Sequence, residues 1–114
     1  MIKQLADALL QRVYNRVIAV VCMDRLDHVL SVVMLDARFA DTDGVANADA
    51  EKVIVICSHP DARRVLEEEE IICCRRIAAQ TEHAALLLYI YDEDGGLCEV
   101  DNSAILGYNG ENAI

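Results

Sequence analysis

Two short runs of aliphatic residues constrain the fold of this chain more than any other feature. Residues 17–23 read VIAVVCM, and residues 52–57 read KVIVIC. An unbroken, β-branched run predicts a strand that is buried on both faces, whereas a strand with one wet face alternates apolar and polar residues. The sequence therefore predicts a sheet with a buried centre and helices packed on it.

Helices are predicted on either side of these strands. Apolar residues over positions 2–15 recur every three or four residues, which is typical of an amphipathic helix. A second helix, of about twenty residues, is predicted from Pro60, because proline suits the first position of a helix. Ser58 or His59 is then expected to be its N-cap.

Residues 24–39 (DRLDHVLSVVMLDARF) fit two predictions. As a helix they have Asp24 as the N-cap and one apolar face. As a strand, the valine-rich part folds back on residues 17–23 as a hairpin. The three closely spaced valines favour the strand, and both structures stay open. Further along, residues 85–92 and 97–101, separated by a turn rich in Asp and Gly, predict a second hairpin.

The order of these elements predicts one α+β domain over residues 1–114, a length that suits a single domain. Its four- to five-stranded sheet is expected to carry the N-terminal helix and one long helix packed on it. Whether residues 53–57 and 85–91 run parallel stays open. The element order, together with the acidity of the chain, also looks like that of type III secretion chaperones.

The charge distribution narrows the class of partner. The formal net charge is −10, and residues 51–114 carry five basic and thirteen acidic side chains. Nucleic-acid phosphates and acidic lipids repel such a surface, which argues against direct nucleic-acid or membrane binding. A basic protein partner fits better.

Cysteine usage predicts the compartment. The cysteines are odd in number and have no paired spacing, and residues 1–15 lack the continuous apolar run of a signal peptide. Reduced thiols in the cytoplasm are therefore expected. The five cysteines are Cys22, Cys57, Cys73, Cys74 and Cys98.

Residues 57–63 (CSHPDAR) follow a predicted buried strand. This Cys-x5-Arg pattern resembles the phosphate-binding loop of cysteine-dependent phosphatases and rhodanese-like domains. The resemblance implies that Cys57 is a nucleophile, activated by a helix N-terminus, and that Arg63 is the anion clamp. However, the loop has no glycine, Pro60 removes an amide donor, and Arg64 stands where those families commonly have Ser or Thr. A plain strand-to-helix turn is favoured, and the enzyme is the alternative.

Neither a metal nor another cofactor is predicted. The acidic segment from Asp41 to Glu51 fails the EF-hand register, because Gly44 and Glu51 fall at the fourth and eleventh positions. The histidines are too scattered for a zinc site. They are His28, His59 and His83.

The predicted long helix supplies the candidate contact surface. Its four glutamates, residues 67–70, are expected to be solvated, whereas residues 71–79 are apolar on most sides and so predict cover by a second layer. The sequence thus predicts a non-catalytic, inhibitor-, immunity- or chaperone-like protein-binding module that forms a homo-oligomer. The expected contact residues are Glu67, Glu68, Ile71, Cys74, Ala78, Asp92, Glu93 and Asp94.

Overall fold

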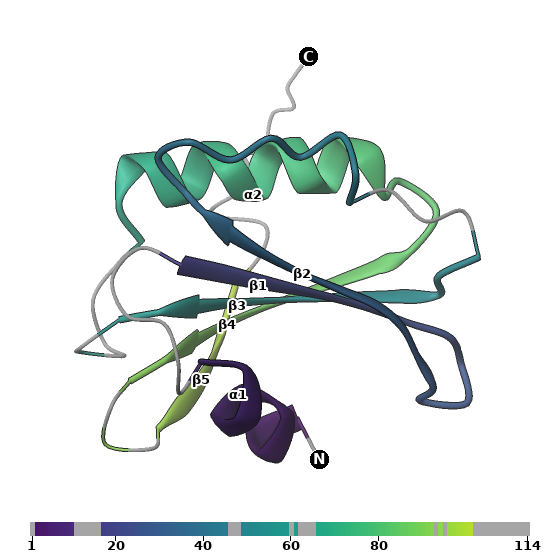
Figure 1. Ribbon diagram of the computed structural model, residues 1–114, viewed down its shortest axis with the longest axis horizontal. Coiled ribbons are helices and arrows are strands. Elements are labelled where there is room, and N and C mark those ends of the chain that lie inside the picture. Colours follow the sequence, from purple (N-terminus) through teal and green to yellow (C-terminus); the bar gives the residue numbers. More distant parts are fainter. Residues whose placement is uncertain are drawn as a thin grey trace.

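The computed structural model describes residues 2–10, 17–45, 49–59, 61, 66–92, 94 and 96–101. In these residues, one mixed sheet of order β2-β1-β3-β4-β5 lies between two helices (Figure 1). The predicted α+β fold, with an N-terminal helix and one longer helix, is confirmed. The elements are α1 Ile2–Leu10, β1 Val17–Met23, β2 Val29–Asp36, β3 Lys52–Ser58, α2 Glu68–Gln80, β4 Ala85–Tyr91 and β5 Leu97–Val100.

The topology answers both questions that the sequence left open. Within residues 24–39, β2 forms the returning strand of a hairpin, because it pairs antiparallel with β1. β3 and β4 run parallel and are connected through α2, while β4 and β5 form the predicted antiparallel hairpin. The turn between β1 and β2 works without glycine because Asp27 adopts a φ of 61°. The Asp24 carboxylate closes this turn by accepting the amides of Leu26 and His28 at 2.9 and 3.0 Å.

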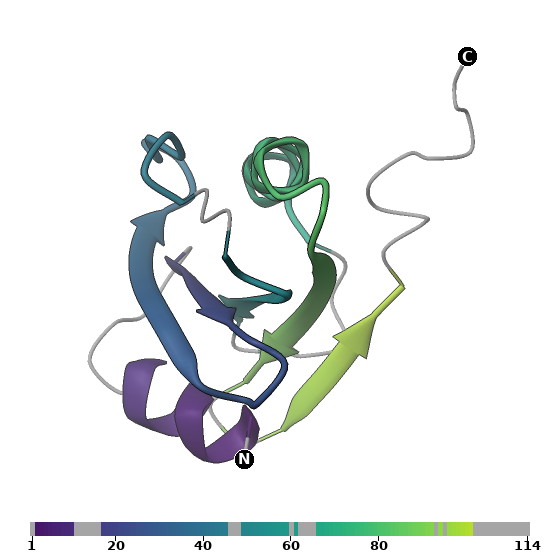
Figure 2. The ribbon, with the colours of Figure 1, turned by 90° about the vertical axis from the view of Figure 1, so that its right-hand side faces the viewer.

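The helices cover opposite faces of the sheet, as two perpendicular views show (Figures 1 and 2). All seven residues of β1 are buried, as are the five central residues of β3, which confirms the strands buried on both faces. Alternate side chains of these strands divide between two apolar clusters, because successive residues of a strand point to opposite faces. The larger cluster lies under α2 and the smaller one under α1.

The prediction that the second helix starts at Pro60 with Ser58 or His59 as its cap is wrong. Ser58 is the last residue of β3, His59 and Asp61 are not helical, and α2 begins at Glu68. A capping box formed by Glu67 and Glu70 sets this start, with the Glu67 amide donating to the Glu70 carboxylate at 2.8 Å. The helix has thirteen residues instead of about twenty.

The remaining element boundaries need little correction. The N-terminal helix ends at Leu10 in the described part, and the rest of its predicted range lies outside the described residues. The predicted tail after residue 101 is outside them as well. Within the described residues, neither helix has the length and apolar composition needed to cross a membrane.

A polar contact holds α1 against the sheet. The Tyr91 hydroxyl of β4 donates to the Asp7 carboxylate of α1. Asp7 also lies 3.6 Å from the Lys3 ammonium one turn away. The hydrogen bond to Asp7, together with burial, raises the pKa of Tyr91 to about 12. Ionisation of Tyr91 would remove the donated proton and set two negative charges against each other.

We therefore expect Tyr91 to titrate at about pH 12 in the folded chain. Because the folded pKa exceeds the unfolded value of about 10, the contact stabilises the fold fully below that unfolded pKa. The contribution is lost as the pH rises through the folded value. The ultraviolet absorbance difference between the wild type and Tyr91→Phe measures this titration. Asp7→Asn should move it back toward the ordinary tyrosine value, and a wild-type midpoint already at that value would contradict the assignment.

Candidate functional site

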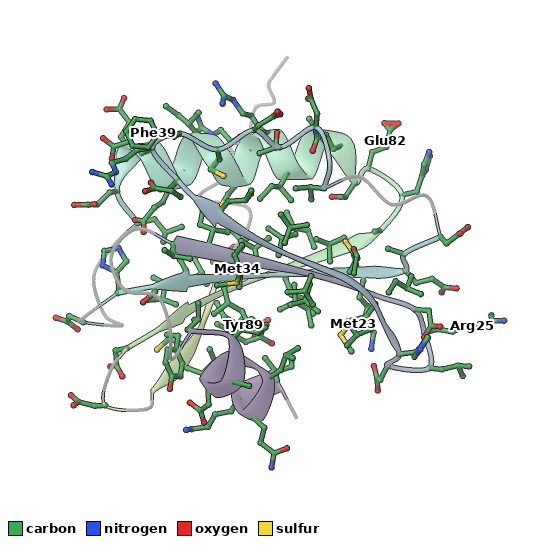
Figure 3. The ribbon with its side chains drawn as sticks, in the orientation of Figure 1. Met23, Arg25, Met34, Phe39, Glu82 and Tyr89 are labelled. Carbon is green, nitrogen blue, oxygen red and sulfur yellow. The ribbon has the colours of Figure 1, made fainter. Side chains whose placement is uncertain are left out.

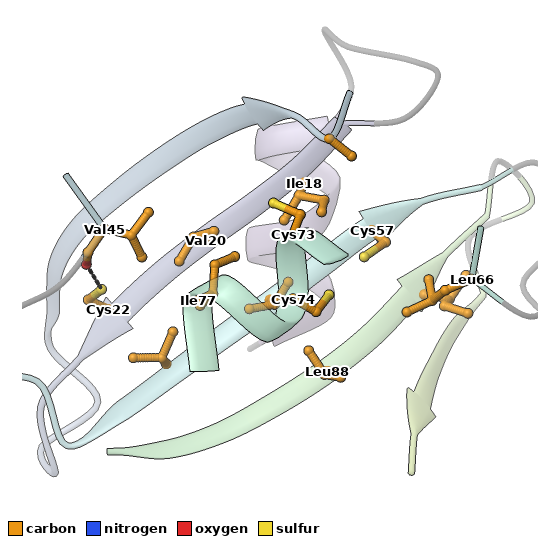
Figure 4. Close-up of a cluster of buried hydrophobic side chains, with 14 of the residues drawn as sticks. Ile18, Val20, Cys22, Val45, Cys57, Leu66, Cys73, Cys74, Ile77 and Leu88 are labelled. Atoms are coloured by element: carbon orange, nitrogen blue, oxygen red, sulfur yellow. Dashed lines mark hydrogen bonds between the residues drawn. The ribbon is translucent and has the colours of Figure 1, made fainter. Parts of the chain in front are cut away.

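The Cys57 thiol lies in the core beneath α2 (Figure 4). Its residue is 1 % exposed, and Cys74, on the facing side of α2, is 0 % exposed. A hydrogen bond with Cys74, together with burial and the nearby Glu70, raises the pKa of Cys57 well above its ordinary value. Burial likewise raises the pKa of Cys73 to about 11. These thiols are held in the protonated form, whereas a nucleophilic cysteine needs the thiolate.

The surroundings that the Cys-x5-Arg resemblance implies differ from those of Cys57. Among the described residues that follow Cys57, Asp61 is not helical and the first helical residue is Glu68, where α2 begins. The helix dipole that would lower the thiol pKa is thus displaced along the chain. Arg63, the implied anion clamp, lies outside the described residues.

A buried polar pair, which the sequence analysis missed, lies next to Cys57. The His59 Nε2 atom is 2.9 Å from the Glu70 Oε1 atom, and the two side chains are 4 % and 0 % exposed. Their other polar atoms, His59 Nδ1 and Glu70 Oε2, have no hydrogen-bond partner among the described residues. Glu70 is therefore not one of a solvated run, as predicted, but part of the core.

This pair joins the end of β3 to the start of α2. The Glu70 carboxylate is hydrogen-bonded to the His59 ring and accepts the Glu67 amide. The His59 amide in turn donates to the Tyr91 carbonyl of β4 at 2.8 Å. Across the part of the chain that the structure describes, no three His, Cys, Asp or Glu side chains converge on a common metal position. The geometry of the pair is that of a structural link between a strand and a helix.

The predicted contact surface on α2 is divided by the structure. Glu68 and Asp94 are exposed, whereas Glu67 caps the helix, Ile71 and Ala78 are half-buried, and Glu93 lies outside the described residues. The Asp92 carboxylate accepts the Gly96 amide at 2.8 Å and so shapes the β4–β5 turn.

Cys74 cannot contact a partner, because it faces the sheet and is fully buried. The expectation of a helix that is apolar on two sides is also corrected. The apolar residues of α2 point mainly to the sheet, while Arg75 and Arg76 are exposed beside Ile72, which is 42 % exposed.

The exposed apolar side chains gather instead on β2 and its flanks. Of the six large hydrophobic residues exposed in the described part of the chain, five lie between residues 26 and 39, and the sixth is Ile72. Figure 3 labels Met34 on β2 and Phe39 beyond its end. We call this set the β2 surface, and it comprises Leu26, Val29, Val32, Met34 and Phe39.

The β2 surface is exposed because α1 does not reach it. Leu30, Val33 and Leu35 point to the other face and pack on the cluster under α2. Val32 and Met34 pair with Val21 and Ala19 and so point to the α1 face, where the cluster takes its side chains from α1 and from the other four strands. β2 is also the outermost strand of the sheet, so its outer edge pairs with no described strand.

An open groove of about 500 Å³ lies beside α1, which lines it with Ile2 and Lys3. Its floor includes Met23 and Ile54, and the Lys52–Asp27 ion pair, 2.7 Å long, lies at its rim. Met23 is the cross-strand neighbour of Val29. The groove therefore borders the β2 surface at its Val29 end.

The fold and these surfaces define a compact α+β domain with a mixed sheet, a buried His–Glu link and an apolar edge strand whose outer edge pairs with no described strand. Comparisons with protein-family models, with curated proteins and with solved structures give no match.

Proposed function

We propose that this chain is a small acidic protein-binding module that acts by contact and has no catalytic role. One observation carries the proposal: five of the six large exposed hydrophobic residues in the described part lie on or beside β2, whose outer edge pairs with no described strand. Edge strands of proteins that work alone are blunted by charges, prolines or covering segments. Residues 29–35, VLSVVML, contain neither charge nor proline. An apolar surface at such an edge is typical of an interaction site.

The surroundings of Cys57 favour contact over catalysis. Its thiol is buried, its pKa is raised, and the helix N-terminus that would activate it lies further along the chain. The cysteine-dependent phosphatase- or rhodanese-like alternative needs the opposite of each of these features.

The acidic surface favours a basic macromolecular partner in addition to the apolar contact. The net charge of −10, with exposed acids such as Glu68 and Asp94, would speed the approach of a positively charged protein. Inhibitor-, immunity- and chaperone-like proteins act in this way. Four of the five cysteines are buried as free thiols, which fits a reducing compartment, and we place the module in the cytoplasm.

Photo-cross-linking tests this proposal. A photoreactive amino acid at Val32, on the β2 surface, is expected to give a defined adduct in an extract of the organism that makes the protein. The same group at Glu82, an exposed residue on the turn after α2, is expected to give none (Figure 3). The mass of the adduct distinguishes a second copy of this chain from another protein.

The adduct should also disappear when Met34 is replaced by lysine, because a charge at the edge opposes apolar contact. Equal labelling from Val32 and Glu82, or no adduct at either position, would contradict a binding role for β2.

A further inference from the structure

We propose that the occupant of the β2 edge is a second copy of this chain, paired antiparallel through β2 about a two-fold axis. This inference rests on the proposed function, since both use the β2 surface. It names the partner and the geometry of the contact. The two five-stranded sheets would join into one continuous sheet, with α1 of both copies on the same face.

The apolar side chains of the β2 surface complement their own copies. Leu26, 81 % exposed, precedes β2, and Phe39, 78 % exposed, follows it. Figure 3 places Phe39 and Arg25, the neighbour of Leu26, at opposite ends of the molecule. In an antiparallel pair, the start of one strand lies beside the end of the other. Each copy would therefore bring the Leu26 end of its β2 beside the Phe39 end of the partner's β2.

Two central residues of β2 direct their backbone groups to its outer edge, which pairs with no described strand. The Asp24 amide donates to the His28 carbonyl on the β2 side, at 3.0 Å, while the Met23 carbonyl accepts the Glu51 amide on the β3 side, at 2.8 Å. Because backbone groups alternate sides along a strand, Cys22 also faces β2, and so do Val20 and Ile18. Their partners, Ser31, Val33 and Leu35, therefore bond inward to β1.

Val32 and Met34 thus direct their amides and carbonyls to the free edge. Their side chains share the α1 face and are 38 % and 37 % exposed. Opposed residues of an antiparallel pair point to the same face. Two conditions fix the register: outward-facing backbone groups must pair with each other, and opposed side chains must share a face. The register that meets both over most of β2 sets Val32 opposite the partner's Met34. Val33 then lies opposite its own copy on the two-fold axis.

Charge explains why this contact closes instead of growing into a fibre. A head-to-tail contact of β2 with the other sheet edge, β5, would repeat without end. β5 presents Glu99 at its exposed edge, and Asp94 lies in the turn before it. The uncharged run over residues 29–35 would have to desolvate those acids. Pairing β2 with itself brings no acid of either strand's centre into the contact.

The net charge of −10 gives the dimer a distinctive salt response. Two acidic copies repel each other over long range, and added salt screens this repulsion. The dimer should therefore tighten as salt is added, whereas a complex with a basic partner should weaken. β5 lies at the far edge of the sheet, so the dimer leaves the acidic β4–β5 turn open to such a partner (Figure 2).

Analytical ultracentrifugation of the full chain tests the dimer. The wild type is expected to sediment as a dimer of the 12.6 kDa chain. The double variant Val32→Lys, Met34→Lys should weaken the dimer by about 100-fold or more, since it sets four ammonium groups in the contact. Ile72→Lys is the matched control, because it adds a charge at a similarly exposed apolar site on α2 and should stay dimeric. Circular dichroism checks that each variant folds.

Introduced cysteines fix the register in a Cys98→Ser background, in which the four remaining native cysteines are buried. Val33→Cys should form an intermolecular disulfide when oxidised glutathione is added, because residue 33 faces itself, whereas Val29→Cys should not. Self-cross-linking at Val32→Cys or Met34→Cys instead would overturn the register.

The dimer and the proposed function fail in different ways. A monomeric wild type, or dissociation caused equally by Ile72→Lys, would overturn the dimer. If that monomer still gave a Val32 adduct with another protein, the binding module would stand without self-association. If it gave none, both proposals would fall.

Discussion

Replacing Glu70 by alanine is expected to destabilise the domain by about 2–5 kcal/mol, because it removes the hydrogen-bond partner of two groups, and leaving a buried polar group unsatisfied costs about 1–3 kcal/mol each. The Glu70 side chain is 0 % exposed and its Oε1 atom lies 2.9 Å from His59 Nε2. The variant would leave the His59 ring buried without this partner and the Glu67 amide without its acceptor. The total free energy of unfolding of a domain is typically about 5–15 kcal/mol, so this variant should be close to unfolding.

Glu68→Ala is the matched control. Glu68 belongs to the same run of four glutamates but is exposed, so the change should alter the free energy of unfolding by no more than about 0.5 kcal/mol. Urea unfolding of both variants provides the comparison. Equal stability of the two variants would show that the His59–Glu70 link contributes nothing.

A double variant separates the pair from the rest of the site. Replacing His59 by leucine and Glu70 by methionine fills similar volumes with apolar groups, a change that often costs little when it removes both partners. The loss of the capping box would persist at about 1 kcal/mol. The double variant should therefore be more stable than Glu70→Ala, which would assign most of the single-variant cost to the unpaired histidine.

The spacing of apolar residues in α2 predicts that Glu70 is buried, although the run of four glutamates around it suggests an exposed segment. Glu70, Cys73, Cys74 and Ile77 are spaced at i, i+3, i+4 and i+7, and all four side chains are buried in α2. The run of glutamates suggested a wet first turn, and Pro60 drew the predicted helix start too early. Glu67 and Glu70 form the capping box that sets the true start. The spacing of residues 67–77 thus indicates the true start of the helix and its buried face, whereas Pro60 alone predicts a start that is too early.

For the strands, the residue types alone predict the buried elements, whereas the turn and the strand order depend on features that local sequence does not show. The continuous aliphatic runs of β1 and β3 suffice to predict strands buried on both faces. The hairpin of β1 and β2 stayed ambiguous, because its turn depends on a positive φ at Asp27 and on the Asp24 side chain rather than on glycine. Which strand lies at the edge depends on the order β2-β1-β3-β4-β5. This long-range fact moves the candidate contact surface from α2 to β2, and no local pattern reveals it.

The largest effect is expected in the rates at which the individual cysteines react with iodoacetamide. Cys98 is exposed and should react with iodoacetamide at the rate of an accessible thiol, whereas the other four cysteines are buried. Cys57 should react at least about 1,000-fold more slowly, because the core must open before reagent enters and opening of core elements costs several kcal/mol. Its raised pKa lowers the thiolate fraction further at neutral pH. Mass spectrometry of each cysteine-containing peptide measures the rates.

Vanadate, a phosphate analogue, makes this labelling decisive between contact and catalysis. If Cys57 acted as the nucleophile of a phosphate- or sulfur-transferring loop, it would react faster than Cys98 below pH 7, and vanadate would protect it. That outcome would require a second arrangement of residues 57–67, in which the thiol leaves the core beneath α2. A slow, vanadate-independent rate equal to that of Cys74 is expected instead. That result would indicate that CSHPDAR is a structural connection, which ends β3 and positions His59 against Glu70.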